Sequence, residues 1–96
     1  MQVVTFNLDG ETLALPTAHL REILEPVPVT RVPQAGAFAH GLINVRGTVV
    51  PLADLRVPLR LKRAQADENT RFLVLELEIS GDFATLAIIA DRVIDV

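Results

Sequence analysis

Three short turn signals divide this 96-residue chain into pairs of strand-length segments. The signals are Asp9-Gly10, Arg46-Gly47 and Ser80-Gly81-Asp82. Each lies between two apolar or alternating stretches, which is the pattern of two antiparallel strands joined by a tight turn. The chain is therefore expected to fold as a series of β-hairpins.

The first hairpin alternates apolar and polar residues, so that one face of each strand can be buried. Its apolar positions are Val4, Phe6, Leu8, Leu13 and Leu15. Pro16 stops the second strand, and Thr17 is expected to cap a short helix. Leu20, Ile23 and Leu24 then fall at the i, i+3 and i+4 positions that share one helix face. A short helix is therefore predicted directly after this hairpin.

Two further hairpins are predicted in the rest of the chain. The second covers residues 42–52 and contains Pro51, which favours an edge strand or a bulge because proline cannot donate to a sheet ladder. The third joins residues 71–79 to residues 83–90, and the nearly continuous apolar run in its second strand predicts a place at the centre of a barrel. Residues 62–70 are charged or small and predict an exposed loop.

Short connecting segments complete this pattern. Residues 54–56 are expected to form a single helical turn, and the chain from Asp91 onward another turn or helix. Gly41 and Gly47 suit backbone turns that are closed to residues with a Cβ. The phenylalanines that lie in strand patterns are expected in a core: Phe6, Phe72 and Phe83. About six short strands with one short helix predict one or two small antiparallel β-barrels, which is an all-β fold.

Composition limits the functions open to the chain. It has no cysteine, which excludes disulfides, thiolate metal sites and a cysteine nucleophile. A formal net charge of −3 and the lack of Tyr and Trp argue against a barrel that binds single-stranded nucleic acid. No segment resembles a signal peptide or reaches the length of a membrane span. A cytoplasmic protein is expected.

Residues that could carry chemistry do not occur at the spacing of a catalytic or metal site. His19 and His40 lie far apart, and neither has a second His or Cys at ligand spacing. Ser80, the only serine, lacks the glycine-flanked context of a nucleophile elbow. The remaining candidates are scattered carboxylates, interpreted as solvated or capping groups: Asp54, Asp91 and Asp95. An enzyme, a cofactor and a metal are therefore not expected.

The residues that composition leaves unexplained form a series of short motifs. In chain order they are Phe6-x-Leu8-x-Gly10-Glu11, Leu20-Arg21-Glu22-Ile23-Leu24, Val32-Pro33, Gly41-Leu42-Ile43-Asn44-Val45-Arg46-Gly47, Val50-Pro51-Leu52-Ala53-Asp54-Leu55 and Ile89-Ala90-Asp91-Arg92-Val93. Each motif is weak alone. Their order and spacing, over essentially the whole chain, resemble those of the CheW-like family.

This resemblance implies two SH3-like barrels packed side by side and a function without catalysis. CheW-like proteins bind the cytoplasmic hairpin tip of chemoreceptors and the regulatory domain of a CheA-type histidine kinase, in arrays at the membrane. Carried over by motif position, the partner-binding residues are Leu20, Glu22, Ile23, Gly41, Ile43, Val45 and Arg46. The resemblance also implies an ion pair between Glu22 and Arg46 near that surface. Two unrelated surface charges are the alternative.

Family members usually continue past the segment that matches residues 91–96, with further strands that complete the barrels. The chain is therefore expected to be a single, C-terminally short domain over residues 1–96 with one incomplete barrel. The sequence is either a piece of a longer chain or a naturally short adaptor, and in the second case the open sheet edge predicts a homodimer or a strand-swapped oligomer. A receptor-only adaptor, like the short adaptors of receptor systems that control gliding motility, is one alternative. A regulatory module from a larger kinase or regulator fusion is another.

Overall fold

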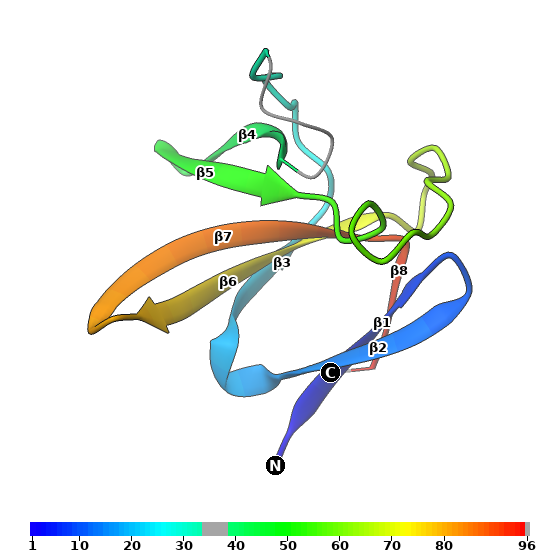
Figure 1. The fold of residues 1–96 in the computed structure, drawn as a ribbon, viewed down its shortest axis with the longest axis horizontal. Helices are drawn as coiled ribbons and strands as arrows, with labels where there is room; N and C mark the ends of the chain where they lie inside the picture. Colours follow the sequence, from blue (N-terminus) through cyan, green and yellow to red (C-terminus); the bar gives the residue numbers. More distant parts are fainter. Residues whose placement is uncertain (34–38, 96) are drawn as a thin grey trace.

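Eight strands and one short 3₁₀ helix make up the described part of the chain, which in this computed structural model comprises residues 1–33 and 39–95. The strands are β1 (Val3–Leu8), β2 (Glu11–Pro16), β3 (Leu20–Leu24), β4 (Ala39–Val45), β5 (Thr48–Ala53), β6 (Arg71–Ile79), β7 (Asp82–Ala90) and β8 (Arg92–Asp95), and the 3₁₀ helix η1 is Thr17–His19. They form a three-stranded sheet in the order β2-β1-β8 and a five-stranded sheet in the order β3-β6-β7-β5-β4 (Figure 1). All three predicted hairpins and the all-β fold are confirmed.

Two apolar cores lie on the two faces of β6 and β7, one between the two sheets and one within the five-stranded sheet. Successive residues of a strand point to opposite faces, so Leu73 packs in one core and Phe72 in the other. We call these the β1 core (Phe6, Leu8, Ala53, Leu73, Leu75, Ile88 and Ala90) and the β5 core (Ile43, Val50, Leu52, Phe72, Val74, Ala87 and Ile89). In Figure 1 the β1–β2 hairpin lies on one side of β6 and β7, and the β4–β5 hairpin on the other. A strand covered on both faces needs apolar residues at every position, which explains the continuous apolar run in β7.

Phe83 is not in a core, contrary to the prediction. Phe6 and Phe72 are buried as expected, but Phe83 is 70% exposed. It pairs with Glu78 near the tip of the β6–β7 hairpin, which projects beyond the rest of the sheet in Figure 1. The strand-like sequence pattern is the same at the base and at the tip of the hairpin. The sequence therefore does not show at which residue the hairpin extends beyond the strands that pack on it.

The segment predicted as a capped helix is instead a three-residue 3₁₀ turn followed by β3. Thr17 makes no capping hydrogen bond with its side chain. β3 pairs with β6, with a bulge between Leu20 and Glu22, so its apolar residues reach both cores: Leu20 and Ile23 the β1 core, and Leu24 the β5 core. Pairing with β6 outweighs the helical spacing because the strand gains ladder hydrogen bonds along one edge and packs apolar residues against both cores.

Two other short segments also differ from the sequence prediction. Residues 54–60 form a series of turns instead of one helical turn, with Val57 N bonded to Asp54 O and Leu59 N to Leu55 O. The residues after Asp91 form β8, which pairs antiparallel with β1. In both places the local sequence is too short to select a helix over contacts made elsewhere in the chain.

Pro51 lies in an inner strand and not at an edge, and the predicted alternative, a bulge, is present on the facing strand between Ala39 and Gly41. β5 pairs antiparallel with β4 and parallel with β7, the latter at Leu52 and Ala53. Pro51 is opposite Leu42, whose backbone N–H and C=O bond to Thr30 instead of to β5. The missing N–H of proline is therefore not needed by β4 at this position, and the described ladder to β7 begins one residue later.

The five-stranded sheet is linked across its two edges by the segment that follows β3. Thr30 makes an isolated bridge to Leu42 on β4, with both N–H to O distances at 2.8 Å. Gly41 permits this contact, because a Cβ there would lie 2.5 Å from the carbonyl oxygen of Thr30 and 2.6 Å from Cγ1 of Val29. Gly41 is therefore a close-approach glycine inside β4 and not the predicted turn glycine.

Candidate partner-binding surface

An ion pair joins the two edge strands of the five-stranded sheet. Glu22 lies on β3 and Arg46 in the turn after β4, and the Arg46 guanidinium donates to Oε2 of Glu22. The side chain of Glu22 is 18% exposed, and that of Arg46 is 74% exposed. The ion pair implied by the family resemblance is therefore present, with a half-sheltered carboxylate and an open guanidinium.

The turn between β4 and β5 fixes the position of Arg46. Arg46 and Gly47 have φ values of 50° and 85° and form a two-residue turn between Val45 and Thr48. Positive φ at both central residues defines a type I′ turn, whose twist matches that of a hairpin. The backbone N–H of Gly47 donates to Oδ1 of Asn44 at 2.8 Å, which secures the turn. The guanidinium is thus presented from a defined loop.

A hollow of about 230 Å³ lies at this ion pair. Side chains from all five strands of this sheet line it, among them Arg21, Glu22, Val45, Thr48, Val74 and Thr85, together with Arg46 of the turn. Arg21 makes a second, exposed ion pair across the sheet with Glu76 of β6, at 3.4 Å. The hollow therefore combines an exposed cation with small polar and apolar side chains.

The seven predicted partner-binding residues fall into two groups. Three line the hollow: Glu22, Val45 and Arg46. Of the other four, Leu20 and Ile23 are partly buried against the β1 core, Ile43 is buried in the β5 core, and Gly41 is buried against Val29 and Thr30. Motif position alone did not separate the two groups, because alternate residues of a strand face opposite sides.

The outward face of the β4–β5 hairpin holds accessible residues that the motif-based prediction did not include. Leu42 and Val49 point away from the β5 core and, with Val27, Pro28 and Thr30, line a mostly apolar hollow of about 430 Å³. Val49 is 63% exposed. The alternation of Val49 with the buried Val50 is the sequence signal that identifies this face.

A buried charge network also escaped the sequence prediction, which interpreted its carboxylates as solvated or capping. Arg56 donates from Nε and Nη2 to the two oxygens of Asp54 at 2.8 and 2.9 Å, and from Nη1 to Asp91 at 2.9 Å. The side chains of Asp54 and Arg56 are 0% and 7% exposed. Asp91 also accepts a hydrogen bond from the backbone of Asp9 at 2.7 Å. The network ties the β1–β2 turn to the ends of β5 and β7.

The electrostatics of this network follow from its hydrogen bonds. Burial acts to raise the pKa of Asp54, but the hydrogen bonds and charge of Arg56 together outweigh it and hold the pKa below its ordinary value of 3.8. The hydrogen bonds of Arg56 to Asp54 likewise raise the pKa of the guanidinium. Both groups are therefore charged at neutral pH, in a paired state that satisfies their hydrogen-bonding capacity.

The histidines lie where no metal site forms. His19 is exposed in η1, and His40 is half-buried on β4. Among residues 1–33 and 39–95, no group of three His, Cys, Asp or Glu side chains could hold a metal ion. The same residues contain no helix with the length and apolar character needed to cross a membrane.

The sheets, the two shared cores and the edge-to-edge closure define a protein of the SH3-like β class. Residues 2–96 match the CheW-like domain family. The chain belongs to the CheW-like family.

Known proteins of this family resemble the chain over most of its length. It is 36% identical to the chemotaxis protein CheW of Helicobacter pylori over 85 residues, which is 86% of this chain and 52% of that protein. It is 27% identical to the CheW of Treponema pallidum, over 96% of this chain and 54% of that protein. The crystal structure of the scaffolding protein TtCheW from Thermoanaerobacter tengcongensis superposes with a TM-score of 0.83 at 29% identity, over 98% of this chain and 62% of that chain. The chain thus spans about half the length of these curated relatives.

Proposed function

We propose that this protein is a non-catalytic adaptor of a bacterial chemosensory array. It binds the cytoplasmic signalling tip of chemoreceptors and couples them to the regulatory domain of a CheA-type histidine kinase, at membrane-associated arrays in the cytoplasm. Membership of the CheW-like family supports this role, as does the likeness to a structure described as a scaffolding protein.

The observation that carries the proposal is the Glu22–Arg46 pair at the junction of β3 and the β4–β5 turn. An arginine on a fixed turn can place its donors with little loss of freedom when a partner binds. The apolar hollow beside Val49 lies on the outward face of the same hairpin. Apolar contacts next to an orienting charge are the composition of a surface that binds other proteins.

The test is retention of the protein on an immobilised receptor-tip fragment, with the kinase regulatory domain added. We expect both proteins to be retained, and Arg46→Ala to lose binding. Lys62→Ala removes an exposed cation outside the two hollows and serves as the matched control. Circular dichroism of each variant verifies that it is folded. If the Arg46→Ala variant and the kinase domain are both still retained, the assigned surface is contradicted. If the wild-type protein and the kinase domain both wash through, the adaptor function is contradicted.

A receptor-only adaptor is the second candidate. The same experiment distinguishes it, because this chain would then be retained while the kinase domain washes through. The oligomeric state of the retained protein is measured by light scattering, since the sequence predicts a homodimer or strand-swapped oligomer. A monomer at high concentration contradicts that part of the proposal.

A further inference from the structure

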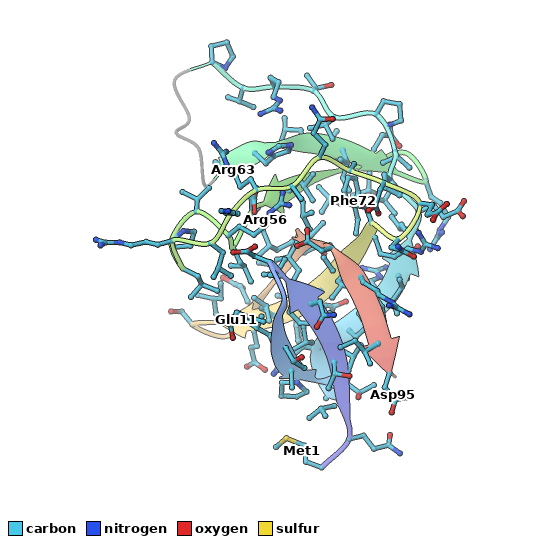
Figure 2. The ribbon with its side chains drawn as sticks, turned by 90° about the vertical axis from the view of Figure 1, so that its right-hand side faces the viewer. Met1, Glu11, Arg56, Arg63, Phe72 and Asp95 are labelled. Carbon is cyan, nitrogen blue, oxygen red and sulfur yellow. The ribbon has the colours of Figure 1, made fainter. Side chains whose placement is uncertain are left out.

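A cavity of about 650 Å³ lies between the extended segment after β3 and the loop that follows β5. One wall is apolar and is formed by Val29, Phe72 and Ile89. Three further lining residues carry or can carry positive charge: Arg31, His40 and Arg63. Figure 2 shows Arg56 and Arg63 on the same side of the molecule, far from Met1. The cavity shares no lining residue with the Glu22–Arg46 hollow.

The charge of this cavity is not balanced. Asp54 and Arg56 also line it, but they are paired with each other. Arg31 and Arg63 form no ion pair with any carboxylate in the described ranges 1–33 and 39–95. Two guanidinium groups without an ion-pair partner in the described ranges therefore line one cavity in a chain whose net charge is −3. Such a concentration of positive charge attracts anions.

His40 lines the same cavity. Its Nδ1 is buried and has no hydrogen-bond partner among the residues that the structure describes. Burial, then the charge of Arg31, lowers the pKa of His40 below its ordinary 6.5, and Arg56 and Arg63 act in the same direction against an opposing effect of Asp54. The ring is therefore neutral at pH 7 and does not repel a positively charged group beside it.

We propose that this cavity binds a small organic anion, with its carboxylate or phosphate between Arg31 and Arg63 and its apolar body against Val29, Phe72 and Ile89. Guanidinium groups bind carboxylate and phosphate oxygens through paired, charge-assisted hydrogen bonds. The cavity volume falls in the range of small-molecule sites, which combine apolar walls with a few polar groups. A ligand here touches residues on β4, β6 and β7, all in the five-stranded sheet, and the connections around them.

The experiment uses the full chain, labelled with ¹⁵N, titrated with phenyl phosphate or with benzoate. Inorganic phosphate supplies the charge without the apolar body, and benzyl alcohol supplies the ring without the charge. We expect saturable amide shifts at Val29, His40 and Thr70, and binding of at least one aromatic anion at least about tenfold tighter than either control compound. Comparison of the two aromatic anions decides between phosphate and carboxylate.

The variants change exposed residues, so that a loss of anion binding does not result from unfolding of the protein. Arg31→Gln and Arg63→Gln are each expected to weaken binding about tenfold, whereas Arg92→Gln, the same change on β8, leaves it unaltered. Bound anion also raises the pKa of the His40 ring, because its charge opposes that of Arg31, Arg56 and Arg63. Absence of shifts at the lining amides, or equal binding by wild type and both variants, overturns the proposal. Binding of an acidic peptide but of neither aromatic anion also overturns it, in favour of a protein-docking site.

Discussion

At the scale of single residues, the Glu22–Arg46 pair is asymmetric. Glu22 is largely sheltered and Arg46 largely open, so the two side chains differ in what is left behind when the partner is removed. Loss of Arg46 leaves a half-buried carboxylate without its counter-charge, whereas loss of Glu22 leaves an arginine that water already solvates. A partly buried charge is costly only when it is unpaired.

We therefore expect Arg46→Ala to lower the free energy of unfolding by about 1 kcal/mol, and Glu22→Gln by less. The double variant Glu22→Gln/Arg46→Ala should be no less stable than Arg46→Ala alone, because it carries no stranded charge. Urea unfolding of the wild type and the three variants gives the four free energies of the cycle. Additive effects of the two single changes would show that the pair contributes no coupling.

Residue-level prediction from sequence had a clear limit at the buried charge network. Asp54 and Arg56 are two positions apart, but Asp91 joins them only after β7 has crossed the sheet. Scattered acidic residues in a sequence are most often solvated, and nothing local distinguishes Asp54 from Asp95. The Glu22–Arg46 pair was accessible only through the motif resemblance, since the 24-residue separation gives no geometric hint by itself.

At the scale of elements, the three hairpins could be predicted from the sequence, but the segment predicted as a helix is a 3₁₀ turn followed by β3. Turn residues and alternation act within a few positions, so β1–β2, β4–β5 and β6–β7 could be predicted from local sequence. β3 is a strand because β6 lies beside it, and the apolar spacing of Leu20, Ile23 and Leu24 fits a helix equally well. Whether this segment forms a strand or a helix therefore depends on β6, which lies about fifty residues later in the chain.

The β6–β7 hairpin offers a direct test of where the cores end. Phe72 is 4% exposed in the β5 core, and Phe83 is 70% exposed near the tip. We expect Phe72→Ala to lower the free energy of unfolding by about 3–5 kcal/mol, through lost burial and the cavity it creates. Phe83→Ala should change it by less than about 0.5 kcal/mol.

Thermal or urea unfolding followed by circular dichroism measures both variants, and Ile79→Ala is a control for the same exposed tip. A large loss of stability on Phe83→Ala would mean that another layer covers the tip in solution. Equal effects of the two phenylalanine substitutions would contradict the two-core arrangement of the sheet.

At the scale of the whole molecule, two kinds of contact hold the two sheets together. The first is the β1 core, which packs β1 of the three-stranded sheet against β5, β6 and β7 and is apolar and indifferent to pH. The second is the Asp54–Arg56–Asp91 network, which connects the end of β5 to the β7–β8 junction and, through Asp9, to the first hairpin. Only the second responds to acid, because only it contains ionised carboxylates.

The pKa of Asp54 is lower in the folded protein than its ordinary value of 3.8, so folding favours the ionised form. The stability that this carboxylate contributes is fully present above pH 3.8 and is lost as the pH falls through the lower, folded-state pKa. Arg56 stays protonated throughout, since its pKa is raised. We therefore expect the urea midpoint of the wild type to be flat near neutrality and to fall steeply below about pH 4.

Asp54→Asn separates this carboxylate from the other acidic groups. It should lower the free energy of unfolding at pH 7 by about 3–5 kcal/mol, because Arg56 then remains buried with one carboxylate partner fewer. Its free energy of unfolding should also fall less with decreasing pH than that of the wild type, because it lacks the carboxylate whose pKa is lower in the folded protein. Glu78→Gln, on the exposed part of β6, is the control for removal of a carboxylate as such. A parallel decline of all three proteins with falling pH would show that the acid response comes from the surface charges and that the network holds the sheets by packing alone.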